Sequence, residues 1–213
     1  MILGITGGTG CGKTTLLEEI EARGGLVLDC DAIYHGLLET DPALLAAIET
    51  RFPGVVEQGS LRRRELGRRV FQDAQALLDL NRITHGAVRA EVKRRLAQGP
   101  GLAAIDAIAL VEAELSGLCD VTVAVTAPTE SRVRRLMERD KISEAYARSR
   151  IEAQKSELFY VQNTDYVLKN DGTLAQFRQR CRDFVENLLS APIPGAEVGN
   201  TRRNPGQAPK SRP

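Results

Sequence analysis

Glycines, a lysine and threonines are crowded together near the start of the chain, in the stretch GGTGCGKTT that covers residues 7–15. Glycines let the backbone wrap closely around an anion, and successive N–H groups can then point inward at a phosphate chain. The spacing Gly7-x-x-x-x-Gly12-Lys13-Thr14 is that of a phosphate-binding loop, the P-loop. Lys13 would reach the β- and γ-phosphates of a nucleotide, and the Thr14 hydroxyl would ligate Mg²⁺. The stretch therefore predicts a nucleotide site rather than a glycine-rich turn without chemistry.

The sequence on both sides of this stretch has the form that a P-loop needs. Residues 2–6 read as a short buried strand, and residues 14–22 as an amphipathic helix whose positive dipole end would face the phosphates. Cys11 is expected to serve only as a small residue within the loop, and Thr15 to add a contact to the α-phosphate. The loop residues that we expect at the nucleotide are Gly8, Thr9, Gly10, Cys11, Gly12, Lys13, Thr14 and Thr15.

Acidic residues end two other predicted strands, where they could assist the transfer of a phosphoryl group. Asp29 and Asp31 end the strand predicted over residues 24–31, and ligands of open α/β sheets bind beyond the carboxyl ends of strands. A carboxylate there can accept the proton of an attacking hydroxyl and orient it, although Asp31 could instead only cap the next helix. Asp106, on a further strand, could hold Mg²⁺ through water or be an ordinary strand-end acid.

Alternating strands and helices predict how these residues are brought together. Residues 33–99 have a helical pattern throughout, with breaks only at Pro53-Gly54 and Gly59-Ser60. Two charged helices are expected between the fourth and fifth strands. The alternation predicts an α/β fold with a parallel sheet and right-handed crossovers. The five expected strands are residues 2–6, residues 24–31, a strand starting near residue 102, residues 119–128 and a short strand within residues 164–172.

Two arginine-rich stretches are each open to two interpretations. In ESRVRRLMERD, residues 130–140, an arginine could close over the transferring phosphoryl group, as in the mobile lid of a kinase. LRRRELGRR, residues 61–69, is expected to be an exposed face paired with Glu65, or else to meet a phosphate of the substrate. The alternative for the first stretch is a solvated helix face, which we expect for most of Arg132, Arg134, Arg135 and Arg139.

Composition excludes several classes of protein. The chain has 213 residues, 42% hydrophobic and 27% charged, which suits a globular domain. A formal net charge of +1 gives no reason to expect nucleic acid or an acidic membrane as a partner, and no obligatory protein partner is evident. No apolar run approaches the roughly 20 residues of a membrane span. Four scattered cysteines without metal-ligand spacing favour reduced thiols in the cytoplasm. Residues 191–213 are expected to form a disordered tail.

Five stretches, in this order, resemble the dephospho-coenzyme A kinase family, and together they extend from residue 2 to about residue 189. They are GITGGTGCGKTT, VLDCDAIYH, SLRRRELGRRVFQD followed by LNRITH, RLMERDKISEAYARSRIEAQ, and TDYVLKNDGTL. Many kinases share the first stretch, but the combination is much more specific. The resemblance implies that ATP, with Mg²⁺, phosphorylates the ribose 3′-hydroxyl of dephospho-coenzyme A, which is the last step of coenzyme A biosynthesis.

The resemblance also implies a fold and its division into parts. The fold would be a P-loop kinase with a five-stranded parallel sheet flanked by helices, a helical acceptor subdomain and a lid. Residues 1–190 would form this domain. Its core would comprise residues 1–32, 100–128 and 164–190, with an acceptor-binding insertion at about 33–99 and a lid at about 129–160.

Individual residues take roles from the same resemblance. Asp31 would be the catalytic base, Lys13 and Arg139 would act on the transferring phosphoryl group, and Asn170 would lie near the adenine. The residues that bind the acceptor would be Asp31, Arg64, His85 and Glu112. The residues that hold the metal would be Thr14 and, through water, Asp106.

Two departures from the family pattern concern the acceptor. His85 is followed by Gly86 where the family has proline, and His35 stands where the family has arginine. Two other functions therefore remain open at this stage. One is a P-loop kinase for another small acceptor, a nucleoside or nucleotide, and the other is a nucleotide-binding regulator without turnover.

Overall fold

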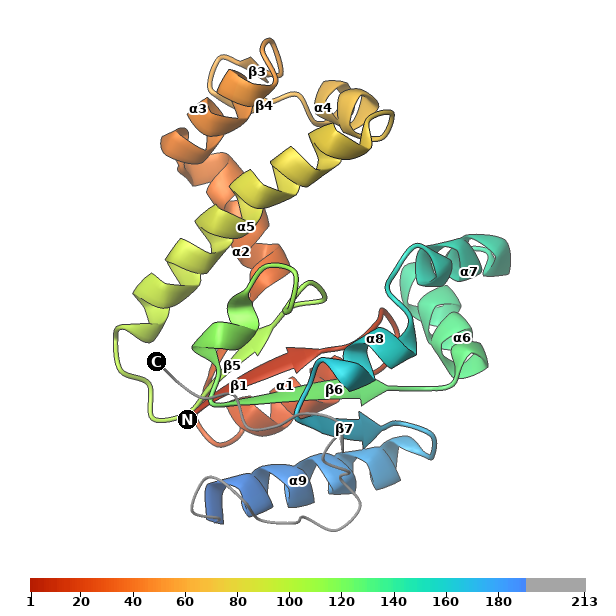
Figure 1. Ribbon diagram of the computed structural model, residues 1–213. Coiled ribbons are helices and arrows are strands. Elements are labelled where there is room, and N and C mark those ends of the chain that lie inside the picture. Colours follow the sequence, from red (N-terminus) through yellow and green to blue (C-terminus); the bar gives the residue numbers. More distant parts are fainter. Residues whose placement is uncertain (191–213) are drawn as a thin grey trace.

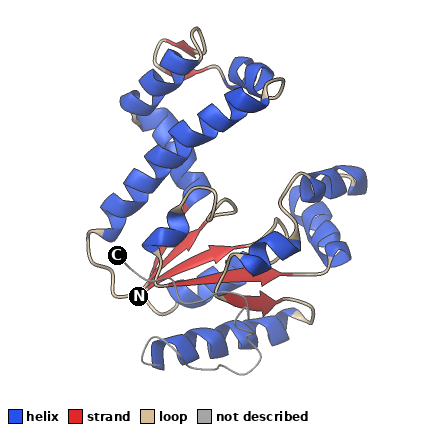
Figure 2. Cartoon of the chain, in the orientation of Figure 1, coloured by secondary structure: helices blue, strands red, loops and turns tan. Residues whose placement is uncertain are grey.

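The computed structural model describes residues 1–190 and has a five-stranded parallel sheet at its centre, with helices on both faces (Figures 1 and 2). The order of the strands in the sheet is β2-β5-β1-β6-β7. The number of strands and their parallel arrangement confirm the prediction. The strands are β1 (Ile2–Thr6), β2 (Leu26–Asp29), β5 (Ala103–Asp106), β6 (Val121–Thr126) and β7 (Tyr166–Lys169).

The middle strands are largely apolar because helices cover both of their faces. All six residues of β6, VTVAVT, are buried. The register aligns Asp106 of β5 with Ile5 of β1 on one side and with Asp29 of β2 on the other. The carboxyl ends of β1, β2 and β5 therefore meet at one edge of the sheet, where the P-loop leaves β1.

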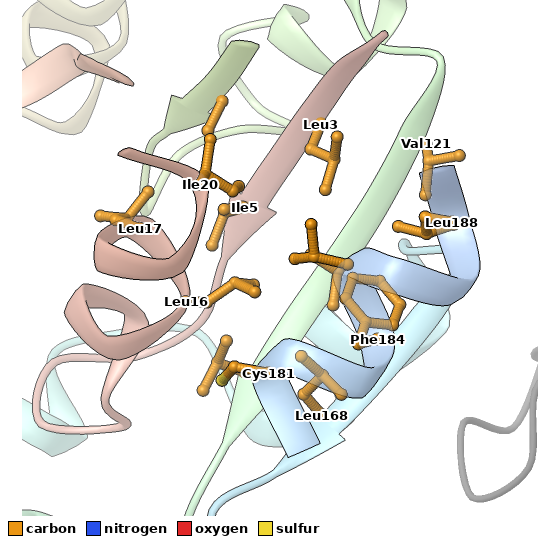
Figure 3. Close-up of a cluster of buried hydrophobic side chains, with 14 of the residues drawn as sticks. Leu3, Ile5, Leu16, Leu17, Ile20, Val121, Leu168, Cys181, Phe184 and Leu188 are labelled. Carbon is orange, nitrogen blue, oxygen red and sulfur yellow. The ribbon is translucent and has the colours of Figure 1, made fainter. Parts of the chain in front are cut away.

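One face of the sheet packs against α1 (Lys13–Glu21) and α9 (Leu174–Ser190). Leu16 and Ile20 of α1 and Phe184 of α9 are almost fully buried, and Figure 3 shows them gathered under β1 with the side chains of the sheet. Burial of such side chains is the main stabilising term of a fold of this kind. This packing fixes the start of α1, which is also the end of the P-loop.

The other face packs against α2 (Cys30–Thr40), α5 (Ala74–Leu96) and the segment that follows β5, which includes a short 3-10 helix, Leu115–Leu118. Val88 and Val92 of α5 meet Leu110 and Leu115 of that segment in a second buried cluster. The first residue of α2, Cys30, is buried in the same cluster. The turn from β2 into α2 is thus held firmly against the sheet.

Helices α2 and α5 extend away from the sheet and, with α3 (Pro42–Arg51) and α4 (Arg63–Val70), form a projecting arm (Figure 1). This arm has its own hydrophobic cluster, in which Ile48 and Val55 are completely buried. A separate cluster allows the arm to hold its shape some distance from the sheet.

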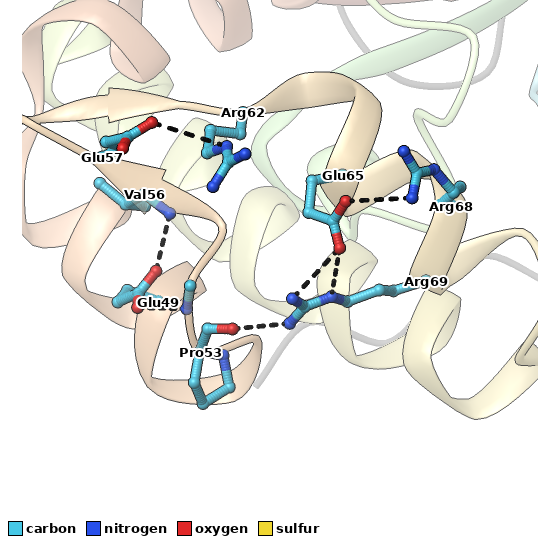
Figure 4. Close-up of polar contacts among 9 residues, drawn as sticks. Glu49, Pro53, Val56, Glu57, Arg62, Glu65, Arg68 and Arg69 are labelled. Carbon is cyan, nitrogen blue, oxygen red and sulfur yellow. Dashed lines mark hydrogen bonds and ion pairs between the residues drawn. The ribbon is translucent and has the colours of Figure 1, made fainter.

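The prediction that residues 33–99 are helical throughout is wrong at the tip of this arm. Two short strands, β3 (Val56–Glu57) and β4 (Ser60–Leu61), form an antiparallel hairpin there. The Glu49 carboxylate accepts hydrogen bonds from the backbone N–H groups of Gly54 and Val56, at 2.5 and 2.7 Å, and so organises the turn before the hairpin (Figure 4). The predicted breaks in the helical pattern lie on either side of β3, and they mark a change of structure rather than gaps between helices.

A second group of helices, α6 (Thr129–Asp140), α7 (Glu144–Glu152) and α8 (Glu157–Gln162), lies between β6 and β7. Two helices were predicted in this stretch. The third, α8, arises because the second predicted helix ends at Glu152 and Ser156 caps a new one, accepting a hydrogen bond from the N–H of Phe159. Figure 1 shows α6 and α7 projecting from the sheet, across from the arm formed by α2 to α5.

Two further sequence predictions concern a membrane span and the C-terminal tail. Among residues 1–190, no helix combines the length and the apolar character needed to cross a bilayer. The tail predicted for residues 191–213 lies outside the described residues.

The separate cluster of the arm predicts a local sensitivity to truncation of its side chains. Ile48→Ala should lower the free energy of unfolding by about 2–5 kcal/mol because it leaves a cavity in that cluster. Leu78→Ala, on a side chain of α5 that is 58% exposed, should change it by less than about 0.5 kcal/mol. Urea denaturation of both variants measures the difference, and equal small effects would show that the cluster does not stabilise the arm.

Candidate active site

The P-loop occupies the turn from β1 into α1, and two of its glycines are required by its geometry. Gly7 has a φ of +132°, and a Cβ at this position would lie 2.2 Å from the carbonyl oxygen of Val125 in β6. Gly12, with a φ of +98°, is the N-cap of α1, and a Cβ there would lie 2.4 Å from Nδ2 of Asn170. Only glycine lets the loop run this close to β6 and to the end of β7.

The backbone of the loop is held from outside by three side chains. Nδ2 of Asn170 donates to the carbonyl oxygen of Cys11 at 2.9 Å. Arg135 donates to the carbonyl oxygen of Gly10 at 3.1 Å, and to Oδ1 of Asn170 at 3.2 Å. Arg132 donates from Nε to the carbonyl oxygen of Thr9 at 2.9 Å.

These contacts decide where the N–H groups of the loop point. In a planar trans peptide, the carbonyl of one residue and the N–H of the next point in opposite directions. Because the carbonyls of Thr9 and Cys11 point outward to side chains, the N–H groups of Gly10 and Gly12 point the other way, toward the cavity that these two glycines line. The loop backbone therefore has the conformation of an anion-binding nest.

A cavity of about 620 Å³ lies beside the loop. It is open to solvent, and both acidic and basic side chains line it, which is typical of a site for a charged ligand. The lining residues come from the P-loop, α1, α2, α6 and α7, from the end of β5 and from the segments just after β5 and α7. They are Thr9, Gly10, Cys11, Gly12, Lys13, Thr14, Asp31, Asp106, Ile108, Arg135, Leu136, Glu138, Arg139, Arg150 and Gln154.

Lys13 and Asp106 face one another in this cavity. The Lys13 ammonium donates to the carbonyl oxygen of Gly7 at 3.1 Å and lies 3.9 Å from Oδ1 of Asp106. Burial raises the pKa of Asp106 to about 6; Lys13 opposes this shift, and the nearby carboxylates of Asp29 and Asp31 add to it. Oδ1 of Asp106 is buried and accepts no hydrogen bond among residues 1–190. This buried oxygen can therefore accept a hydrogen bond or ligate a cation.

The two acids at the junction of β2 and α2 have different environments, which the sequence did not separate. Asp29, the last residue of β2, is the N-cap of α2, and its Oδ1 accepts from the N–H groups of Asp31 and Ala32 at 2.9 and 3.0 Å. The interpretation in which Asp31 caps the helix is therefore wrong. Asp31 does not end the strand but lies in the first turn of α2, where it is exposed and lines the cavity.

Arg139 lines the cavity but is not aimed at the loop. Its guanidinium forms a two-point ion pair with the neighbouring Asp140, at 2.6 and 3.0 Å. Arg150 of α7 donates to the same carboxylate at 2.5 Å. The two guanidinium groups lower the pKa of Asp140 to about 2. Asp140 thus holds two cations at the edge of the cavity.

Several predicted residues do not line this cavity. His85 of α5 lies beside Glu112 in the segment after β5; burial lowers the pKa of His85, and Glu112 opposes that shift. Arg64 is exposed on α4, in the projecting arm. Asn170 is buried behind the loop, and Thr15 donates its N–H to the carbonyl of Gly12. The predicted contacts of these residues, and of Gly8, with ligands remain predictions.

Sequence reasoning missed the residues of α6, and one residue just after α7, that touch the loop. The expectation of a solvated helix face is wrong for Arg132, which is buried, and for Arg135, which is half-buried. Gln154 accepts from the N–H of Thr9 at 2.8 Å and was not predicted at all. A signal was present in α6, because Arg132, Arg135 and Arg139 recur at intervals of three and four residues and therefore share one helix face.

The sequence of the chain matches the family described as dephospho-CoA kinase over residues 1–176. The chain belongs to this family. A dephospho-CoA kinase of Syntrophotalea carbinolica is 37% identical over 201 residues, covering 92% of this chain and 93% of the relative. A dephospho-CoA kinase of Corynebacterium diphtheriae is 35% identical, over 88% of this chain and 92% of the relative.

Two solved structures have a fold similar to that of this chain. A crystal structure of a protein from Thermus thermophilus has a TM-score of 0.76 and 31% identity, and the match covers 90% of this chain and 98% of that one. A dephospho-CoA kinase from Campylobacter jejuni has a TM-score of 0.62 at 23% identity, over 88% of this chain and 96% of that one, which shows the fold. Membership of the family confirms the resemblance that the five sequence stretches indicated.

The raised pKa of Asp106 predicts a pH-dependent stability in this family member. The pKa of the Asp106 carboxyl is about 6 in the folded protein and 3.8 in the unfolded chain, so the folded state binds this proton more tightly. The free energy of unfolding therefore falls as the pH rises between these two values. Asp106→Asn, which cannot ionise, should therefore be more stable than the wild type at pH 7.5, by on the order of 3 kcal/mol. The two should converge near pH 4. Thermal unfolding without Mg²⁺ or nucleotide measures this, and a constant difference from pH 4 to 7.5 would contradict it.

Proposed function

We propose that this chain transfers the γ-phosphoryl group of ATP to the ribose 3′-hydroxyl of dephospho-coenzyme A in the cavity beside the P-loop. The observation that carries this proposal is the meeting of Lys13, Thr14, Asp31, Asp106 and Arg139 around one cavity, in a member of the dephospho-CoA kinase family. Residues 33–99 would form the acceptor-binding insertion and residues 129–160 the lid. The alternatives of another small acceptor or of a regulator without turnover have no supporting observation in the site.

Asp31 would act as the base that accepts the proton of the attacking hydroxyl. It lines the cavity, it lies across from the loop on a different element, and the Asp29 cap fixes the first turn of α2 on which it sits. Because its carboxylate is exposed, it is free to accept a hydrogen bond from an incoming hydroxyl. Its contribution would be to orient that hydroxyl and to receive its proton.

The site also fits a magnesium ion. Mg²⁺ in phosphoryl-transfer sites binds through one or two protein oxygens together with phosphates and water. Thr14 and Asp106 offer such oxygens on the cavity wall, and Oδ1 of Asp106 has no hydrogen-bond partner in the described part of the chain. Residues 1–190 contain no cluster of three acidic, histidine or cysteine side chains that could hold a metal without phosphate. When bound, the ion would neutralise phosphate charge.

Lys13 and the arginines would supply the remaining positive charge. The Lys13 ammonium is held at the loop by the Gly7 carbonyl, so the loop itself sets its position. Arg139 and Arg150 are held at the cavity edge by Asp140, from which phosphate oxygens could draw them. A charge that is held in place, as that of Lys13 is, needs little reorganisation during the reaction, and such charges would supply much of the rate acceleration.

A coupled assay of ADP release tests this function. With ATP and Mg²⁺, release should depend on dephospho-coenzyme A and should be weak with adenosine or AMP as the acceptor. Lys13→Ala should reduce the rate by at least about a hundredfold, since it removes a charge aimed at the transferring group. ADP release that is equal with and without dephospho-coenzyme A, or a folded Lys13→Ala variant of normal activity, would rule the proposal out.

The different environments of Asp31 and Asp29 predict different effects of their substitution. Asp31→Asn should lower kcat by about a hundredfold or more, with unchanged thermal stability, because it removes only the proton acceptor. Asp29→Ala should lower stability by about 1 kcal/mol through loss of the helix cap, whereas Asp29→Asn should keep the cap. Kinetics and thermal unfolding of the three variants test this. An inactive Asp29→Asn beside an active Asp31→Asn would reverse the assignment.

A further inference from the structure

Arg132 is a buried cation without a counter-charge. Its side chain lies in α6, the residue is only 8% exposed, and among residues 1–190 no carboxylate lies within ion-pair distance of it. Nε donates to the carbonyl oxygen of Thr9 at 2.9 Å and Nη2 to Oε1 of Gln154 at 3.2 Å, and both acceptors are neutral. A buried charge without a charged partner is costly, so such a position calls for an anion from outside the chain.

The guanidinium lies directly against the start of the P-loop. A Cβ on Gly8 would be 2.3 Å from Nη2 of Arg132 and 3.1 Å from Oε1 of Gln154. Gly8 has no unusual φ, so the lack of a side chain there serves to admit these two groups. The loop and α6 are therefore fitted to one another around Arg132.

Gln154 presents its side-chain oxygen where a phosphate oxygen could sit. Oε1 accepts hydrogen bonds from the backbone N–H of Thr9 at 2.8 Å and from Nη2 of Arg132 at 3.2 Å. One neutral oxygen thus occupies the position to which both the amide and the guanidinium donate. Gln154 lines the cavity and Arg132 does not, so the carboxamide forms the wall in front of the cation. Amide and guanidinium donors of this kind are those that bind phosphate most strongly.

The position of Lys13 indicates which phosphate this cradle would meet. In P-loops the lysine reaches the β- and γ-phosphates. The Lys13 ammonium donates to the carbonyl of Gly7, so these phosphates would lie at the beginning of the loop, next to Thr9. The helix end of the loop, at Gly12 to Thr14, is left for the phosphates nearer the nucleoside.

We propose that Arg132 and the Thr9 N–H form an additional subsite for the terminal phosphate of ATP, which Gln154 fills while no nucleotide is bound. This inference rests on the proposed function. A γ-phosphate oxygen takes the place of the Gln154 oxygen and gives Arg132 its counter-charge. ADP has no γ-phosphate and leaves Gln154 in place. The subsite therefore favours ATP over ADP and helps to release the product.

Affinity for the two nucleotides tests the subsite without any acceptor. Arg132→Met should weaken binding of a non-hydrolysable ATP analogue by at least about tenfold, since a hydrogen-bonded charge is lost. Binding of ADP should weaken much less, because ADP loses only the hold of Arg132 on the Thr9 carbonyl. Arg134→Met is the control, because Arg134 is an exposed side chain on the same helix and should leave both affinities unchanged. Equal losses for both nucleotides would mean that Arg132 only holds the Thr9 carbonyl, and would overturn the inference.

A second variant keeps the test decisive if Arg132→Met does not fold. Gln154→Glu places a carboxylate of the same size beside Arg132, so the subsite carries its own anion. Gln154→Glu should raise the melting temperature of the nucleotide-free protein by a few degrees. It should also weaken binding of the ATP analogue at least about tenfold, with little change in the affinity for ADP. The rise in melting temperature should vanish when Arg132→Met is added. Unchanged affinity for the ATP analogue in Gln154→Glu would contradict the subsite.

These binding measurements separate the subsite from the proposed function. Discrimination between ATP and ADP that depends on Arg132, in a protein that does not phosphorylate dephospho-coenzyme A, would keep the subsite and reject the function. Phosphoryl transfer to dephospho-coenzyme A by a protein whose ATP and ADP affinities respond equally to Arg132→Met would keep the function and reject the subsite.

Discussion

The active site depends on hydrogen bonds that hold the P-loop from outside. The carbonyls of Thr9, Gly10 and Cys11 accept from side chains of α6 and of the end of β7, and this turns N–H groups toward the cavity. Most of these donors are arginines, so the same contacts also bring positive charge to the loop. The helices that form part of the predicted lid are therefore joined at their base to the nucleotide site. An anion site that is preorganised in this way has little ordering entropy left to lose when the ligand binds.

The parallel sheet brings the acids to this loop by register alone. Asp29 and Asp106 are aligned at the ends of neighbouring strands, and β5 is in turn aligned with β1, which leads into the loop. Asp29 uses its carboxylate to cap α2, Asp106 is buried beside Lys13, and Asp31 is left exposed to the cavity. One sheet edge thus gives three carboxylates three environments, and their chemistry follows from those environments rather than from their residue type.

The sequence predicted the parts of this arrangement that depend on local pattern. Periodicity located the five strands, and the P-loop spacing located Lys13 and Thr14 on the cavity wall. It could not separate Asp29 from Asp31, because the two lie only two residues apart and the choice depends on where the first turn of α2 begins. It did not single out Gln154, although the stretch that resembles the family's lid ends at this residue, because only tertiary packing brings its side chain to the loop. Arg132 was misjudged because a charged helix is usually solvated, and only tertiary packing buries it.

A crystal structure with a non-hydrolysable ATP analogue, Mg²⁺ and dephospho-coenzyme A would test the central claim most directly. The claim is that a loop already in its binding conformation positions the γ-phosphate against a hydroxyl that Asp31 orients. The account predicts a P-loop backbone that superposes within about 1 Å on the present one, and an Asp31 carboxylate within hydrogen-bond distance of the ribose 3′-hydroxyl. A loop that refolds around the phosphates, or a 3′-hydroxyl bound away from Asp31, would contradict it.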